Sequence, residues 1–160
     1  MIKPSSLARA YERNTRIIEM QADGLSHADS LIQTDYNINC LNWTIGHIVG
    51  YRDASLELLG VEPLMGAAAD RYARESDPIR EDGPGVLPLA ELVALARRSQ
   101  EHLADAISAT SLDAFVEERT FGDRTSTLGS QMLFNYFHDT YHTGQTELLR
   151  QVAGTDDSII

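Results

Sequence analysis

Two histidines, His138 and His142, lie four residues apart in the C-terminal segment FNYFHDTYHTGQTE. Residues with this spacing share one face of an α-helix, so both imidazoles can bind one metal ion if another helix supplies a third ligand. His47 is the best candidate for that third ligand. Three imidazoles from two neighbouring helices would leave coordination positions open, which is typical of a catalytic metal site and not of a structural one.

Other interpretations of these residues remain open at the level of sequence. Pairs of histidines with helical spacing also arise by chance, and a lone histidine in an apolar row is more often a hydrogen-bonded core residue. A zinc-protease helix of the HExxH type is excluded, because Asp139 and not glutamate follows His138. Of the remaining histidines, His27 is expected in a solvated loop and His102 as a structural residue.

Nucleophilic catalysis has weaker support. Cys40 is the only cysteine, and we expect it to be a small buried residue and not a nucleophile. No Ser-His-Asp arrangement can be argued from the spacing of these residue types. The chemistry predicted from the sequence is therefore that of a metal centre.

Four segments of helical periodicity must position these histidines. They cover roughly residues 5–23, 41–59, 88–108 and 129–153. Each has an apolar face, so the sequence predicts an all-α fold, a four-helix bundle in a single domain over residues 1–160. The second segment is apolar over a wide arc and is expected to be the central helix, with neighbours on more than one side.

The limits and faces of these helices can be predicted in more detail. Ser5 or Ser6 is expected to cap the first helix, and Asn39 or Asn42 the second. In the last helix one apolar stripe recurs at spacings of three, four and seven residues, and we expect it to pack into the bundle. That stripe consists of Leu133, Phe137, Tyr141 and Leu148.

The connections between the helices differ in length. Residues 60–87 form a connector long enough to span a 20-residue helix of roughly 30 Å, so the second and third helices can run parallel. A short helical turn is expected near residues 67–74 and another in SLDAF. The alternating segment FVEERTFGDRTSTL predicts a small hairpin around Gly122 and Asp123.

Composition restricts the partners and the compartment. The formal net charge of −11 argues against nucleic acid and against anionic membranes as partners. A single cysteine cannot form an internal disulfide, the N-terminus MIKPSSLARAYERN lacks the apolar core of a secretory signal, and no apolar run is long enough for a membrane span. We therefore expect a soluble cytoplasmic protein.

Two segments of the chain, NWTIGHIVGYRDASLELLG and TLGSQMLFNYFHDTYHTGQTELLRQVAG, resemble the two signature helices of the DinB/YfiT-like superfamily of putative metalloenzymes. In that family a histidine midway along the second helix and the two of an HxxxHxGQ helix surround a divalent metal. The resemblance assigns these roles to His47, His138 and His142. Thr143, where an arginine is common, departs from the pattern and is expected to alter the rim of the pocket.

The resemblance also implies an activity and an assembly. Similar proteins include bacillithiol and mycothiol transferases and a thiol-dependent maleylpyruvate isomerase, while others look like hydrolases; many are homodimers. We therefore expect a divalent-metal enzyme, zinc or nickel being favoured, that transfers a small thiol to an electrophile. Tyr51, Asn135 and Gln145 are candidate substrate-binding residues, with core or interface hydrogen bonding as the alternative. A metal-dependent hydrolase and a non-catalytic dimeric stress-response or binding module are the alternative functions.

Overall fold

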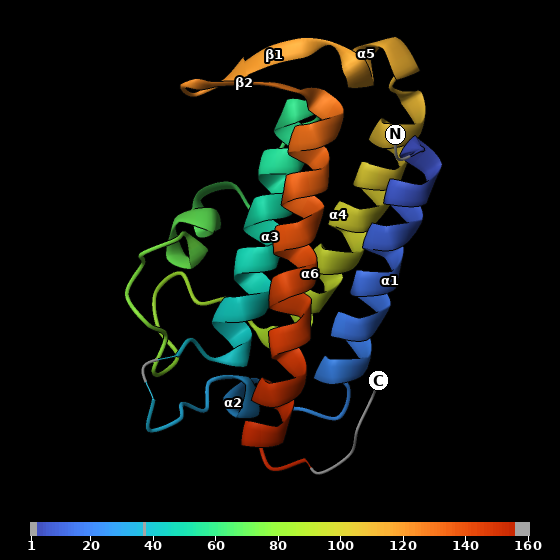
Figure 1. The fold of residues 1–160 in the computed structure, drawn as a ribbon. Coiled ribbons are helices and arrows are strands. Elements are labelled where there is room, and N and C mark those ends of the chain that lie inside the picture. The colour runs from blue at the N-terminus through green and yellow to red at the C-terminus, as the bar shows by residue number, and fades with distance from the viewer. Residues whose placement is uncertain (1–2, 37, 156–160) are drawn as a thin grey trace.

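In the part of the chain that the structure describes, four long helices lie side by side and form the body of the protein (Figure 1). The computed structural model describes residues 3–36 and 38–155. The long helices are α1 (Pro4–Ala22), α3 (Leu41–Leu58), α4 (Leu89–Ala109) and α6 (Leu128–Val152). Helix α3 packs against both α4 and α6, and α1 packs against the same two helices. The predicted all-α class is confirmed.

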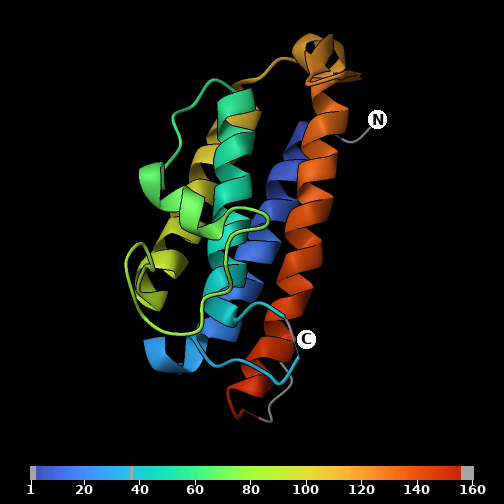
Figure 2. The ribbon, with the colours of Figure 1, turned by 90° about the vertical axis from the view of Figure 1, so that its left-hand side faces the viewer.

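Five short elements connect the long helices. They are the helical turns α2 (His27–Ser30), η1 (Gly66–Tyr72) and α5 (Leu112–Val116), and the antiparallel strands β1 (Glu118–Phe121) and β2 (Arg124–Thr127). The two helical turns and the hairpin predicted from the sequence are therefore present. The hairpin crosses one end of the bundle, and η1 lies beside α3 within the long connector (Figure 2).

The two predicted helix caps are wrong. Helix α1 begins at Pro4 with Lys3 as its N-cap and no side-chain cap, because proline fits the first turn, where its missing N–H is not needed. Helix α3 has Cys40 as its N-cap, also without a side-chain bond. Asn42 lies inside that helix, and its side chain bonds the connector instead of capping the helix. Its Nδ2 donates to the Leu87 carbonyl, and its Oδ1 accepts from the Tyr72 hydroxyl.

Hydrogen bonds between α3 and α4 give the relative direction of these helices. Asn42, in the first turn of α3, bonds the carbonyl of Leu87, just before α4 begins. Arg52, ten residues further along α3, bonds the carbonyl of Ala96, within α4. Both helices therefore run in the same direction, and the connector that joins them returns along the outside of the bundle beside α3 (Figure 2).

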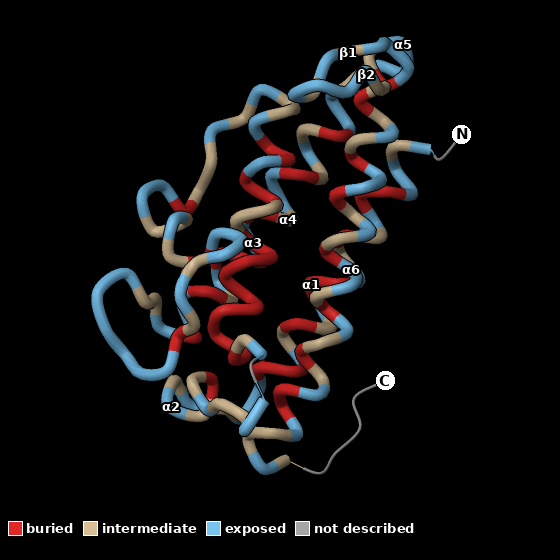
Figure 3. The backbone as a smooth tube through the Cα atoms, turned by 60° about the vertical axis from the view of Figure 1, so that its left-hand side comes forward, coloured by how far each residue is buried: buried red, intermediate tan, exposed pale blue. Residues whose placement is uncertain are grey.

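Helix α3 is buried on nearly every side, as its wide apolar arc predicted. An unbroken run of its residues, 41–49, is buried, and Figure 3 shows the middle of the helix in the buried class. The buried side chains include the polar Arg52, only 1% exposed. Its Nε donates to Asp139 Oδ2 at 2.6 Å, and its Nη1 donates to Thr15 Oγ1 at 2.9 Å and the Ala96 carbonyl at 2.7 Å. Arg52 thus bonds all three of the other long helices.

The apolar stripe predicted for the core side of α6 faces solvent instead. Leu133, Phe137, Tyr141 and Leu148 are 41%, 64%, 58% and 63% exposed. The buried face of α6 is a different and more polar row, which consists of Leu128, Met132, Asn135, Asp139, Thr143, Thr146, Leu149 and Arg150. Hydrogen bonds such as Asn14 Nδ2 to Asp139 Oδ1, at 2.7 Å, stabilise this polar row inside the bundle. The prediction was wrong because buried polar pairing, and not hydrophobicity, selects the inward face.

None of the helices in the described part of the chain combines the length and the apolar character needed to cross a bilayer.

Candidate metal centre

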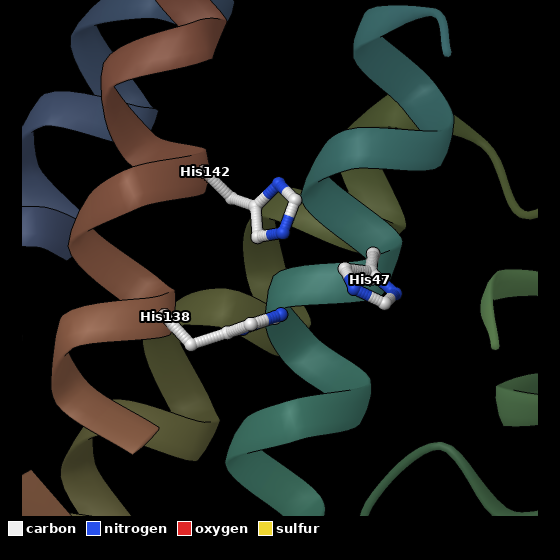
Figure 4. A group of neighbouring side chains, drawn as sticks. All are labelled: His47, His138 and His142. Atoms are coloured by element: carbon white, nitrogen blue, oxygen red, sulfur yellow. The ribbon is translucent and has the colours of Figure 1, made fainter. Parts of the chain in front are cut away.

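Three imidazoles from two adjacent helices converge at the seam between α3 and α6 (Figure 4). His47 lies midway along α3, and His138 and His142 lie one turn apart on the facing side of α6. One nitrogen from each ring can be chosen so that all three lie within 4.8 Å of one another. Within residues 3–36 and 38–155, no further His, Cys, Asp or Glu joins this group. The structure therefore brings together the three histidines that the sequence singled out.

His47 is held in one orientation by two contacts. Its Nδ1 lies 2.7 Å from the backbone carbonyl of Tyr72, and its ring stacks on Trp43 with centroids 4.4 Å apart and planes 16° from parallel. A carbonyl oxygen can only accept, so Nδ1 carries the proton and Nε2 keeps a lone pair for a metal ion. This backbone partner is the type of contact that fixes metal-ligating histidines in general.

His142 is oriented by a residue of its own helix. Its Nδ1 lies 2.7 Å from Oε1 of Gln145, three residues further along α6. The amide oxygen accepts the Nδ1 proton, which again leaves Nε2 as the nitrogen able to bind a metal. Gln145 thus has a definite structural role beside its candidate role as a substrate-binding residue.

His138 differs from the other two histidines in its hydrogen bonding. Its Nδ1 is buried and has no hydrogen-bond partner in the described part of the chain. Its ring stacks on the Tyr51 ring, with centroids 3.6 Å apart and planes 19° from parallel. A buried polar atom without a partner is costly and calls for an explanation, such as an ion. A metal ion bound through this nitrogen would supply one.

The surroundings keep all three imidazoles neutral near pH 7. Burial, together with smaller contributions from the nearby His142 and His47, lowers the pKa of His138 to about 4. Burial also lowers the pKa of His47 and of His142, although their hydrogen bonds to Tyr72 and Gln145 act in the opposite direction. Metal ions bind the neutral form of histidine, so the site is already in the protonation state that a divalent ion requires.

A cavity of about 620 Å³ opens beside the three histidines. Tyr51 and Gln145, two of the candidate substrate-binding residues, line it. Most of the remaining lining is apolar. The other lining residues are Ile38, Asn39, Trp43, Thr44, Arg74, Phe134, Leu148, Leu149 and Val152, together with the three histidines.

Two residues of the sequence prediction lie elsewhere. Asn135 is buried in the seam between α3 and α6, where its Nδ2 donates to Ser55 Oγ and its Oδ1 accepts from Gln131. Thr143 is buried in the bundle instead of at the rim of the cavity. Both belong to the inward row of α6, and neither of them lines the cavity.

The remaining histidines and the cysteine lie outside this site. His27 is half-buried, and its Nδ1 accepts from the backbone N–H of Leu89, so it is not the solvated loop residue expected. His102 is exposed on α4. Cys40 is buried at the start of α3, as expected, and burial raises the pKa of its thiol, which disfavours a nucleophilic role.

Several residues that shape the site could not be found from the sequence. Tyr72 and Arg74 come from the long connector, whose path over α3 leaves no periodic signal. Gly46, directly before His47, has a hidden role: a Cβ atom there would lie 2.1 Å from Cδ1 of Tyr72. A glycine at this position lets the connector approach α3 closely enough for the Tyr72 carbonyl to reach His47.

The fold and the three convergent imidazoles define a helical bundle with a candidate metal-binding site in the seam between two helices. The model of the DinB superfamily matches residues 10–146, which is most of the chain, and the protein belongs to that superfamily. A search of curated proteins found no match.

Proposed function

We propose that the protein is a divalent-metal-dependent enzyme that transfers a small thiol to an electrophile. The observation that carries this proposal is the set of three neutral imidazoles at the edge of a cavity, with no fourth protein ligand in the described part of the chain. A structural zinc site would use four protein ligands. A divalent ion held by neutral ligands alone would keep its full charge and lower the pKa of a thiol placed beside it.

The chain itself would bind and orient the reactants. Tyr51 lies against His138 and lines the cavity, so its hydroxyl can hold a polar group of a substrate beside the three histidines. Apolar side chains of the lining, such as Phe134 and Leu149, exclude water from that space. Lower water content strengthens each electrostatic interaction within the cavity. Zinc or nickel suits three imidazoles, and bacillithiol, mycothiol or glutathione would be the thiol.

The test is consumption of a thiol. Metal-loaded protein would be incubated with bacillithiol, mycothiol or glutathione and monobromobimane as a generic electrophile, beside a His138→Ala variant. We expect faster loss of at least one thiol with the wild-type protein than with the variant. If a protein shown to hold metal consumes none of the three, the thiol-transfer proposal fails.

A metal-dependent hydrolase is the second candidate. The same neutral ligand set would let an ion activate water instead of a thiol. Ester and amide substrates tested on metal-loaded protein without any thiol would separate the two reactions. Turnover in the absence of thiol would favour hydrolysis.

A homodimer is proposed from the exposed face of α6. None of its exposed residues carries a charge, although the chain as a whole has a net charge of −11. These residues are Ser130, Leu133, Phe134, Phe137, Thr140, Tyr141, Gly144, Leu148 and Gln151. Aromatic enrichment and charge depletion are typical of protein interfaces, and an uncharged face lets two acidic copies meet without direct repulsion. A non-catalytic dimeric binding module would use the same face.

Light scattering tests this assembly. We expect a dimer for the wild-type protein and a monomer for Phe137→Lys, because a lysine would be buried without a partner. Phe137 does not line the cavity, so the metal content of the variant should be unchanged. A wild-type protein that is monomeric at high concentration would contradict the proposal.

A further inference from the structure

The charge of the cavity differs from the charge of the protein. The chain has 24 acidic and 13 basic residues, yet no Asp or Glu is found among the described residues that line the cavity. Among the described lining residues, Arg74 alone carries a formal charge. A cavity whose described lining contains an arginine and no carboxylate attracts anions.

The position of Arg74 is fixed by its neighbours in the connector. Two residues before it, the Tyr72 carbonyl bonds His47 Nδ1. Two residues after it, Ser76 Oγ accepts from Trp43 Nε1 at 2.8 Å. Between them Glu75 has a φ of 68°, a left-handed conformation that is unusual for a residue other than glycine. The segment is thus tied to α3 on both sides of a tight turn, which places Arg74 at the rim.

The guanidinium group remains available to a ligand. Its contact with Glu75 spans 3.5 Å between groups that are 80% and 82% exposed. An exposed pair of this kind contributes little free energy, so a better partner can replace it. A carboxylate is such a partner, because the planar guanidinium can donate two parallel hydrogen bonds to it.

The remainder of the cavity suits an apolar group. Phe134 is 57% exposed and Leu148 is 63% exposed, and both lie along the lining with the half-buried Val152. Ile38 adds a further exposed apolar side chain. A ligand that covered these side chains would remove apolar surface from water, which favours binding.

We propose that the cavity binds a small organic carboxylate, with its anionic group paired to Arg74 and its apolar body against Phe134 and Leu148. This inference rests on the proposed function, because it names the class of electrophile that would meet the thiol. It also gives the connector a role, since that segment supplies both the Tyr72 carbonyl and the arginine.

Calorimetric titration tests the inference with a matched pair of probes, 4-phenylbutanoate and its uncharged amide. Metal-free and zinc-loaded proteins would be used, so that pairing with Arg74 is separated from any contact with zinc. In the metal-free protein we expect the carboxylate to bind about tenfold more tightly than the amide, the scale of one charge-assisted hydrogen-bond pair. Arg74→Gln should remove most of this preference and leave amide binding unchanged. Arg80→Gln, at an exposed position of the same connector outside the lining, should keep it.

Three results would overturn the inference. They are equal binding of both probes to the wild-type protein, no binding of either at about millimolar concentration, and an equal weakening of both by Arg74→Gln. The carboxylate that pairs with Arg74 could instead belong to the thiol, and glutathione, a polar thiol with carboxylates, tests this alternative. If Arg74→Gln weakens the binding of glutathione but not that of 4-phenylbutanoate, the assignment to an apolar carboxylate is overturned.

The outcome of this titration does not depend on whether the protein catalyses the proposed thiol transfer. Binding of the probes requires no turnover, and the metal content of each preparation is measured independently. A carboxylate preference that depends on Arg74, in a protein that consumes no thiol, would support the binding site and contradict thiol transfer.

Discussion

At the scale of single residues, each imidazole of the centre has a different environment. His47 and His142 have hydrogen-bond partners for Nδ1, whereas Nδ1 of His138 is buried without one in the described part of the chain. His138 is therefore the ligand whose own environment most clearly calls for an ion. It is also the ligand whose loss should be easiest to interpret, since its Nδ1 has no hydrogen bond to a described residue that removal would break.

We expect His138→Ala to abolish tight metal binding. Removal of an outer hydrogen-bond partner of a metal ligand already costs about 10- to 100-fold in affinity, so loss of a ligand itself should exceed about 100-fold. His102→Ala, at an exposed position of α4, is the control and should leave binding unchanged. Metal analysis and competition with a chelator measure the effect. Wild-type affinity in the His138 variant would remove His138 from the site.

The low pKa of His138 predicts how stability depends on pH in the metal-free protein. The pKa of His138 is about 4 in the folded protein against 6.5 for an ordinary histidine side chain, so between these limits the unfolded chain binds more protons. The free energy of unfolding should therefore fall as the pH drops from 6.5 toward 4, and this contribution should level off below 4.

Two measurements check this. Urea denaturation of the wild-type protein should lose stability over that pH range, and the loss should be smaller in His138→Ala. NMR titration of the metal-free protein should place the pKa of the His138 ring near 4. A His138 signal that titrates near 6.5 would contradict the burial described for this ring.

At the scale of elements, the fit between α3 and the connector depends on Gly46. A Cβ atom at this position would lie 2.1 Å from the Tyr72 ring, so Gly46→Ala must displace the connector or the helix. We expect a loss of about 1–3 kcal/mol in the free energy of unfolding, the usual cost of overpacking, together with weaker metal binding. Urea denaturation and metal titration measure both.

Gly50 provides the matched control one turn further along α3. No heavy atom lies within 4 Å of a Cβ built at this position. Gly50→Ala should therefore be neutral or stabilise the protein by up to about 1 kcal/mol, because alanine favours the helix. If Gly46→Ala and Gly50→Ala changed stability and metal binding equally, the position of Tyr72 against α3 would not require a glycine at position 46.

The elements also show what can be predicted from the sequence and what cannot. The four-residue spacing of His138 and His142 and the turn at Gly122 and Asp123 are local signals, and the structure has both features in the expected places. The stripe through Phe137 and Tyr141 was assigned to the wrong side, because periodicity indicates an apolar face without indicating what covers it. Arg74 and Tyr72 escaped prediction because their role depends on the path of a connector.

At the scale of the whole molecule, Arg52 holds the bundle together at its centre. It bonds Asp139 of α6, Thr15 of α1 and the Ala96 carbonyl of α4. Asp139 directly follows His138, and Arg52 lies on the same helix as His47. The network therefore fixes the position of α6 relative to α3, on which the convergence of the three imidazoles depends.

Loss of Arg52 should destabilise the folded protein strongly. Arg52→Met would leave the carboxylate of Asp139 buried without its cation, and we expect a loss of about 3–5 kcal/mol in the free energy of unfolding. Arg98→Met, at an exposed position of α4, should change stability by less than about 0.5 kcal/mol. Thermal and urea denaturation test both variants. A loss below about 1 kcal/mol for Arg52→Met would mean that packing alone holds the helices in place.

The acceptor that orients His47 is a main-chain carbonyl, and this has a consequence for how the centre tolerates mutation. Every amino acid at position 72 would still present that oxygen, so no exchange of a side chain there can delete it. What can be lost is the location of the oxygen, through a shift of the loop that carries it. Damage to the centre should thus arise from changes that push the loop outward, some of them remote from any ligand. Loss of the buried Tyr72 ring, whose hydroxyl bonds Asn42 and the backbone N–H of Leu87, would be one such change.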